Sequence, residues 1–228
     1  MPAGPSIDFW FEFASTYSYV AAMRIEGLCR DAGVGLVWRP FLLGPIFALQ
    51  GWETSHFNLN PRRGAYMWRD MERLCAKFGL PWRRPSEFPR NTIVPARVAC
   101  AVAHKPWCAE FVRRVYVANF GEDRAIGSRD IVAEILTELG QDAEAVLARA
   151  ESPDWKPALR ANTELATDLG IFGAPNCVTN RELFWGEESL DDAIAWARAS
   201  APGENAQAVQ RVVTGEYSRT PSLGRVEE

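Results

Sequence analysis

Alternating apolar and polar positions open the chain. Between residues 7 and 13 every second side chain is Ile or Phe, and the opposite face includes Glu12. This period of two is typical of a β-strand. A helical stretch from Thr16 to Ala32 follows and ends at Gly33, and Val34 to Arg39 have the pattern of a second strand. Strand, helix and strand within about 35 residues predict a βαβ unit with parallel strands.

The centre of the chain has helical periodicity. Apolar side chains recur three and four positions apart, which predicts amphipathic helices with one buried face. The helical segments span about residues 62–78, 91–104, 107–119, 129–139, 142–150 and 155–169. Residues 40–61 are rich in Gly, Pro and Asn and are predicted to form a long loop. Loops of this length are often functional.

Short strands return near the end of the chain. Residues 176–179 and 182–185 have strand patterns around a tight turn at Asn180 and Arg181. Ser189 is predicted to cap a final helix that ends near Ala199. Beyond it, the sequence becomes polar with little periodicity.

This order of elements predicts an α/β, thioredoxin-like fold in which an all-helical insertion separates a βαβ half from a ββα half. We expect residues 1–40 and 170–200 to form the split thioredoxin-like domain. Residues 41–169 would then hold the long loop and the helical insertion. Residues 201–228 are predicted to be a flexible C-terminal tail.

Composition and charge narrow the classes of function. The 228 residues are 47% hydrophobic and 24% charged with a net charge of −4, which is typical of a globular protein and gives no reason to expect a nucleic-acid partner. Residues 62–97 nevertheless carry nine Lys or Arg against three Asp or Glu. This excess indicates either solvated helix faces or a rim that attracts a small anion. No apolar run reaches about 18 residues and the start has no signal-like pattern, so we expect neither membrane insertion nor secretion.

The cysteines and histidines argue against redox and metal chemistry. Five cysteines without C-x-x-C spacing are expected to be reduced thiols in the cytoplasm. Cys177 is expected to be a core residue and not a reactive thiol. The two histidines, His56 and His104, are too few for the usual zinc clusters, so no metal is expected.

Three segments carry candidate chemistry, and each has a plainer explanation. Ser15 and Thr16 stand where the free N–H groups of a helix N-terminus favour an anion such as a thiolate, or one of them is simply the N-cap. Pro175 begins a strand, where its peptide bond is either cis and shapes a ligand-facing bend or an ordinary trans turn. Glu187 and Glu188 precede the last helix, where they either complement its dipole or hold an ammonium group.

These segments resemble the 2-hydroxychromene-2-carboxylate isomerase family, within the wider group of DsbA-like proteins and kappa-class glutathione transferases. The family has S-P-Y-S-Y after its first strand, and residues 15–19 are S-T-Y-S-Y. The family motif G-[IV]-F-G-[AV]-P matches residues 170–175, and E-L-F-W-G-x-D-R-L is matched by E-L-F-W-G-E-E-S-L at 182–190. The resemblance covers about residues 7–199.

The resemblance implies a glutathione site. Ser15 and Ser18 stand at the two cysteine positions of a C-x-x-C motif, so the Ser15 hydroxyl would donate a hydrogen bond to the glutathione sulfur and favour its thiolate. The family's proline at position 175 is cis, and its acid at position 188 faces the γ-glutamyl end. The implied contacts are Ser15, Tyr17, Asn58, Ala174, Pro175, Glu188 and Ser189, with Asn60 as an alternative to Asn58.

The activity that this resemblance implies is a glutathione-dependent cis–trans isomerisation in aromatic degradation, with Ser15 as the catalytic residue. The thiolate adds to a double bond, the resulting single bond rotates, and the thiolate leaves. The partner would be a small aromatic carboxylate, and a homodimer is compatible with the family. Two other functions stay open, namely a kappa-class-like transferase or peroxidase that consumes glutathione and a non-catalytic thioredoxin-fold binding protein.

The chain departs from the family pattern at several positions. Thr16 replaces the usual proline, Glu188 and Ser189 replace Asp-Arg, and Arg62 or Arg63 replaces the usual lysine. Glutathione binding is compatible with these changes, whereas they leave the identity of the substrate open.

Overall fold

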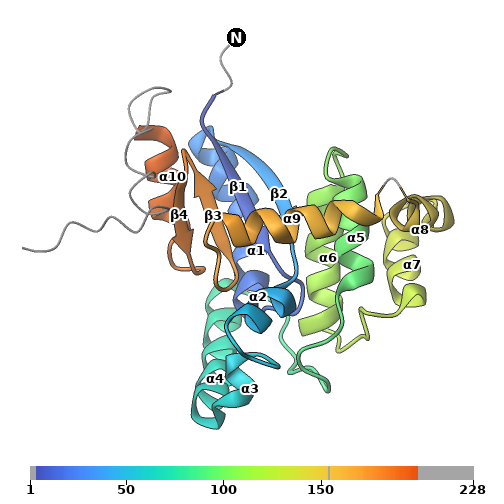
Figure 1. Ribbon diagram of the computed structural model, residues 1–228, viewed down its shortest axis with the longest axis horizontal. Coiled ribbons are helices and arrows are strands. Elements are labelled where there is room, and N and C mark those ends of the chain that lie inside the picture. Colours follow the sequence, from blue (N-terminus) through green and yellow to red (C-terminus); the bar gives the residue numbers. More distant parts are fainter. Residues whose placement is uncertain (1–3, 154, 200–228) are drawn as a thin grey trace, which may run out of the picture.

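The structure is a computed structural model that describes residues 4–153 and 155–199 (Figure 1). The strands are β1 (Ser6–Phe11), β2 (Gly35–Pro40), β3 (Asn176–Thr179) and β4 (Glu182–Trp185). The helices are α1 (Thr16–Ala32), α2 (Leu43–Leu49), α3 (His56–Leu59), α4 (Pro61–Phe78), α5 (Ile93–Val102), α6 (Cys108–Phe120), α7 (Arg129–Glu138), α8 (Ala143–Glu151), α9 (Lys156–Asp168) and α10 (Leu190–Ala199).

The sheet has the strand order β2-β1-β3-β4. β1 pairs in parallel with β2, and β3 pairs antiparallel with both β1 and β4. A βαβ half and a ββα half therefore share one sheet, and α2 to α9 lie between them in the chain. This arrangement confirms the predicted thioredoxin-like α/β fold. Its proposed division into domains stays a prediction, and the predicted tail lies outside the described residues.

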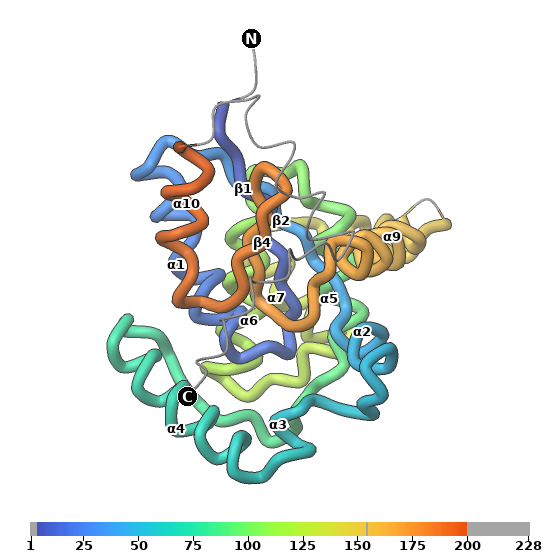
Figure 2. The backbone as a smooth tube through the Cα atoms, turned by 60° about the vertical axis from the view of Figure 1, so that its left-hand side comes forward, coloured from blue at the N-terminus to red at the C-terminus, as the bar shows by residue number. Residues whose placement is uncertain are grey.

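Both faces of the sheet are covered, although the alternation along β1 predicts only one apolar face. Phe9 and Phe11 belong to the larger apolar core, which also contains side chains of α1, α10 and the helical insertion. Trp10 points to the opposite face and packs in a smaller cluster with Ile46 of α2 and Ala166 of α9. Figure 2 shows α1 and α10 on one side of the sheet and α2 and α9 on the other.

The helical insertion shares its core with the sheet. Met67 and Met71 of α4, Phe111 of α6 and Ile135 of α7 are fully buried in the same apolar cluster as Phe9 of β1. Figure 1 places α5 to α8 beside the sheet and α3 and α4 at its lower end. One continuous core therefore fixes the insertion relative to the strands.

The prediction of a long loop over residues 40–61 was wrong, because this segment contains the helices α2 and α3. Pro45 lies in the first turn of α2, where a missing N–H costs no helical hydrogen bond. Burial of Ile46 and Phe47 then stabilises the short helix. Ser55 caps α3 by accepting a hydrogen bond from the Phe57 N–H at 3.3 Å.

The first strand ends two residues earlier than predicted. Residues 12–15 form a turn, in which the Ser15 N–H donates to the Glu12 main-chain oxygen at 3.0 Å. The turn also uses the Glu12 side chain, whose Oε2 accepts from the Ala14 N–H at 2.8 Å. Because both bonds close locally, the chain leaves the sheet and enters α1.

All five cysteines are buried and unpaired. Burial raises the pKa of the Cys177 thiol, in agreement with its expected role in the core. Among residues 4–153 and 155–199, no helix combines the length and apolar character needed to cross a bilayer.

Substitution of Tyr116 in α6 tests how much the contact between the helical insertion and the turn after β1 contributes to stability. Its buried ring packs 5.2 Å from Phe13, and its hydroxyl donates to the Glu12 main-chain oxygen at 2.9 Å. Tyr116→Phe should lower the free energy of unfolding in urea by about 1 kcal/mol, since one hydrogen bond is lost. Tyr116→Ala should lower it by about 3–5 kcal/mol.

Tyr66→Phe is the matched control, since this ring is 62% exposed. It should change the free energy of unfolding by no more than about 0.5 kcal/mol. Equal effects at Tyr66 and Tyr116 would show that the contact between α6 and the turn contributes nothing to stability.

Candidate active site

Ser15 stands at the junction of strand, helix and a distant loop. It is the N-cap of α1, and its Oγ accepts a hydrogen bond from the Ser18 N–H at 3.2 Å. The same hydroxyl donates to the Ala174 main-chain oxygen at 3.1 Å. The N-cap explanation and the site explanation therefore both hold, because Ser15 caps the helix and also lines a cavity.

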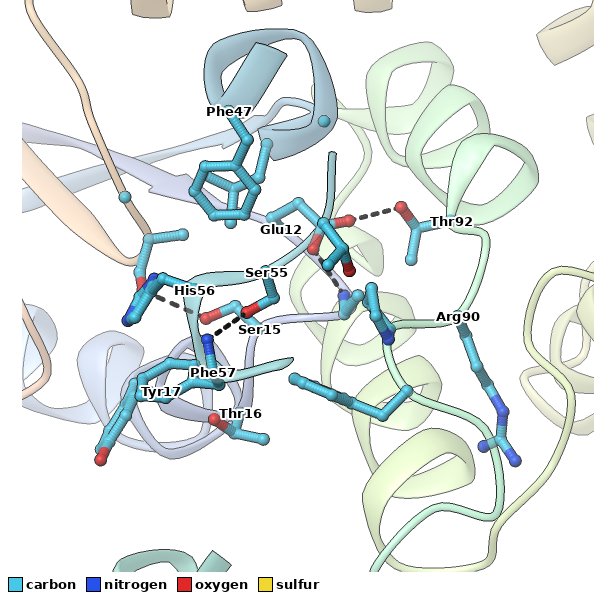
Figure 3. Close-up of a pocket in the computed structure, with 18 of the residues that line it drawn as sticks. Glu12, Ser15, Thr16, Tyr17, Phe47, Ser55, His56, Phe57, Arg90 and Thr92 are labelled. Atoms are coloured by element: carbon cyan, nitrogen blue, oxygen red, sulfur yellow. Dashed lines mark hydrogen bonds between the residues drawn. The ribbon is translucent and has the colours of Figure 1, made fainter. Parts of the chain in front are cut away.

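This cavity lies at the end of the sheet where β1 gives way to α1, and it has a volume of about 1270 Å³. It opens between the N-terminus of α1, the α2–α3 segment, the start of α4 and the loops before β3 and α10. Figure 3 shows Ser15, Ser55 and Glu12 between Phe47 on one side and Thr16 on the other. Pockets for one small ligand usually measure roughly 300–1,000 Å³, so this cavity is larger than most single-ligand pockets.

Four of the seven predicted glutathione contacts line the cavity, namely Ser15, Tyr17, Ala174 and Glu188. Pro175 follows Ala174 in the chain and is not part of the lining, and the Ala174–Pro175 peptide is cis, as the resemblance implied. A second cis peptide, Phe88–Pro89, also borders the cavity, and nothing in the sequence pointed to it.

The remaining predicted contacts lie outside the cavity lining. The Asn58 side chain donates to the main-chain oxygen of Phe88 at 3.2 Å and thus ties α3 to the segment before α5. Its alternative, Asn60, caps α4 by accepting from two N–H groups at 3.1 Å each. The Ser189 hydroxyl donates to the Trp185 main-chain oxygen at 2.8 Å, and α10 begins at the next residue. Glutathione contacts from these residues stay predictions.

One wall of the cavity is acidic. The Tyr17 hydroxyl donates to Asp70 Oδ2 at 3.1 Å, and burial is the main cause that raises the pKa of Tyr17. Glu187 pairs with Arg24 at 2.6 Å, and burial raises the pKa of its carboxyl. Glu188 also lines the cavity, and no cation of the described residues pairs with it. This carboxylate is therefore available to a ligand's ammonium group.

Another part of the cavity lining is aromatic, and basic residues lie beside it. Phe47, His56 and Phe57 line the cavity. Trp52 packs behind them, with its ring centroid 5.6 Å from that of Phe47 and 5.7 Å from that of His56. Arg62 and Arg63, at the start of α4, also line the cavity. Burial and, to a lesser extent, the neighbouring Arg63 guanidinium lower the pKa of His56. A flat, anionic ligand is the chemical class that such a lining accommodates.

Glu12 is a cavity residue that sequence reasoning missed. It was predicted only to lie on the polar face of a strand, whereas it is 6% exposed and forms part of the cavity lining. Burial raises the pKa of its carboxyl from 4.5 to about 7, against the opposing effect of hydrogen bonds from Thr92 and Ala14. The available signal was an acidic residue in a Phe-rich strand, three positions before Ser15.

The family model for the DSBA-like thioredoxin domain matches residues 6–194. The chain belongs to this family. This DSBA-like protein is 27% identical over 187 residues to the 2-hydroxychromene-2-carboxylate isomerase of Sphingobium xenophagum, which covers 82% of this chain and 94% of the relative. It is 28% identical over 188 residues to glutathione S-transferase kappa 2 of Caenorhabditis elegans, which covers 77% of this chain and 81% of the relative.

A solved structure of 2-hydroxychromene-2-carboxylate isomerase superposes on this DSBA-like protein with a TM-score of 0.75 at 22% identity, and covers 86% of this chain and 100% of that chain. This similarity supports the fold, and the two sequence relatives confirm the resemblance inferred from the motifs. Within the described residues, no group of three or more His, Cys, Asp or Glu side chains is arranged to hold a metal.

The serines of this DSBA-like protein limit its chemistry. Ser15 and Ser18 occupy the ends of the S-T-Y-S segment at the start of α1, and the cysteines lie elsewhere in the core. A hydroxyl at this place donates a hydrogen bond but forms no disulfide. A thiolate at this site must therefore be brought by a ligand.

The electrostatics of the aromatic part of the lining can be tested through His56. Arg63→Gln should raise the pKa of His56, because it removes a positive charge that disfavours the imidazolium. The pKa should stay below its ordinary value, since burial remains. An NMR titration of the imidazole C–H signals measures this shift.

Arg63→Lys is the matched control, because it preserves the charge and should leave the His56 titration close to that of the unaltered protein. A fall in the His56 pKa in Arg63→Gln would contradict the assigned cause.

Proposed function

We propose that this protein is a glutathione-dependent enzyme that catalyses cis–trans isomerisation of a small aromatic carboxylate, in the manner of its 2-hydroxychromene-2-carboxylate isomerase relatives. The carrying observation is the position of the Ser15 hydroxyl. It lies in a large cavity, at the N-terminus of α1, and the lining of this cavity contains both acidic and aromatic side chains.

The polar groups of the cavity fit glutathione. Glu188 suits the γ-glutamyl ammonium group, and the main chain of Ala174 suits the cysteinyl amide. The first N–H groups of α1 lack intrahelical partners and favour an anion. Bound glutathione would supply a nucleophilic thiolate at this place.

Ser15 would change partner when the ligand binds. Its hydroxyl now donates to the Ala174 oxygen, which would instead accept from the amide N–H of the ligand. The released hydroxyl would then donate to sulfur. Each group exchanges one hydrogen bond for another, so the rearrangement leaves no buried polar group unpaired.

The substrate would lie against the aromatic part of the lining. The aromatic side chains Phe47 and Phe57 would pack on its ring, and Arg62 or Arg63 would attract its carboxylate. The cavity volume of about 1270 Å³ accommodates a tripeptide and an aromatic molecule together. Simultaneous binding is what nucleophilic catalysis by a bound thiol requires.

A kappa-class-like transferase is the second candidate, because a kappa transferase matches this chain at 28% identity. Both activities would use the same thiolate site. They differ in the net consumption of glutathione, since an isomerase leaves the total glutathione thiol unchanged and a transferase consumes it.

The test combines binding and turnover. Glutathione would be titrated calorimetrically into the reduced protein, and 2-hydroxychromene-2-carboxylate would then be supplied while its absorbance and the free thiol are followed. Conversion at constant thiol supports the isomerase, and conversion with loss of thiol supports the transferase. Absence of glutathione binding at millimolar concentration would reject both and favour a non-catalytic binding protein.

Ser15→Ala should reduce turnover at least tenfold and weaken glutathione binding, because sulfur loses its hydroxyl donor. It should also lower the free energy of unfolding by about 1 kcal/mol, since Ser15 caps α1. Steady-state kinetics, calorimetry and urea unfolding measure these effects.

Asp142→Ala is the matched control. Asp142 caps α8 in the same way, by accepting from the Ala145 N–H at 3.1 Å, and does not line the cavity. It should cost similar stability and leave turnover unchanged. Unchanged turnover in Ser15→Ala would refute the role of Ser15.

A further inference from the structure

Glu12 occupies an unusual place for a carboxyl group. Its side chain is almost fully buried, it lines the cavity, and it precedes Ser15 by three residues. Figure 3 shows it between Thr92, to which it is hydrogen-bonded, and the region of Ser15 and Ser55. The mechanism proposed above gives this group no task.

The hydrogen bonds around Glu12 suit both of its protonation states. Oε2 accepts from the Ala14 N–H at 2.8 Å, and it can do so whether the carboxyl is charged or neutral. Oε1 is bonded to the Thr92 hydroxyl, which can donate to a carboxylate or accept from a carboxylic acid. Thr92 makes no side-chain cap with α5, so its hydroxyl is not committed to the helix.

No cation neutralises the Glu12 carboxylate among the described residues. Arg90 also lines the cavity, but in Figure 3 its side chain points away from Glu12, and it is bonded to Asp123 and Asn119. Tyr116, on α6, donates to the main-chain oxygen of Glu12, and burial keeps its phenol neutral by raising its pKa. The other ionisable groups that line the cavity are Tyr17, Glu53, His56, Arg62, Arg63, Tyr66, Asp70, Glu187 and Glu188.

We infer that Glu12 is the proton acceptor for the thiol ligand of this cavity. The S–H bond of the ligand breaks, its electron pair stays on sulfur beside Ser15, and the proton forms an O–H bond on the Glu12 carboxylate. When the ligand leaves, the proton returns to sulfur. This inference rests on the proposed function, because it requires that glutathione binds.

The physical reason is that a buried site tolerates one negative charge more easily than two. A thiolate beside an ionised Glu12 would face like-charge repulsion at low dielectric. Transfer of the proton to Glu12 leaves a single negative charge, held by Ser15 and by the N-terminus of α1. Ionisation of the thiol and protonation of Glu12 are therefore coupled.

The coupling predicts how many protons binding releases. With a Glu12 pKa of about 7, the carboxyl is mostly protonated at pH 6 and mostly ionised at pH 8. Binding as thiolate should therefore release about 0.9 protons at pH 6 and close to none at pH 8, for a thiol pKa of about 8.5. Glu12→Gln removes the acceptor, so it should release about 1 proton at pH 6 and about 0.8 at pH 8.

The experiment is glutathione calorimetry at both pH values, each in two buffers of different ionisation enthalpy, with thiolate followed by its ultraviolet absorbance. Glu12→Gln is close in shape, and its amide can accept from Ala14 and donate to Thr92. S-methylglutathione, which has no thiol proton, should bind without this proton exchange. Thr92→Val removes a hydrogen bond that lowers the Glu12 pKa, so more of the Glu12 carboxyl is already protonated at pH 7. Glutathione binding to this variant should therefore release more protons at pH 7.

Several outcomes would overturn the inference. One is that the unaltered protein and Glu12→Gln release the same number of protons at pH 8 although both bind glutathione as the thiolate. Another is that the unaltered protein binds glutathione without forming the thiolate. If Glu12→Gln fails to fold, unchanged release in a folded Thr92→Val would also overturn it. Absence of glutathione binding to the unaltered protein would instead reject the proposed function, and this inference with it.

Discussion

The turn at residues 12–15 is the feature on which the rest of the site depends. Its main-chain bond from the Ser15 N–H to the Glu12 oxygen ends β1 and starts α1. The turn is also held from the helical insertion, because Tyr116 donates to the Glu12 oxygen and Asn119 donates to the Phe13 oxygen at 3.0 Å. The insertion thus has a structural task that a simple addition to the thioredoxin-like fold would not have. It fixes the position of the serine.

The same turn buries a carboxyl group at a cost in stability. The pKa of Glu12 is raised from 4.5 to about 7, so the folded protein keeps this proton over a pH range in which the unfolded chain has lost its own. The contribution of Glu12 to the free energy of unfolding therefore falls as the pH rises through that range, and the loss is complete above about pH 7. A neutral residue of similar size would avoid this loss. Such costs are common at functional sites, where local chemistry outweighs stability.

Local pattern was sufficient for elements whose signals are short-range. The β3–β4 hairpin was predicted with its observed bounds, because two short strand patterns flank a two-residue turn. Asn180 favours the positive φ that this turn requires, and Arg181 adopts it as well. The helix α2 was not predicted, because its stability depends on contacts that are distant in the sequence. Pro45 and its neighbours locally suggest a loop, and only burial against Trp10 and α9 favours the helix. The burial of Glu12 was missed because the residues that contact it, Thr92 and Tyr116, lie about eighty and a hundred positions away in the sequence. Three-dimensional proximity of this kind leaves no periodic trace.

Replacement of a redox cysteine pair by Ser15 and Ser18 changes what the fold must provide. A cysteine thiol of the protein can lose its proton before any ligand binds, whereas in the proposed mechanism the ligand thiol would arrive neutral and lose its proton within the cavity. The helix N-terminus and the Ser15 hydroxyl would stabilise the resulting anion, but neither of them is a base that would take up the proton. A buried carboxyl that can hold or release a proton would meet this requirement without adding a second charge. In the proposed mechanism this role of Glu12 would offset the stability lost by burying an acidic residue in the cavity.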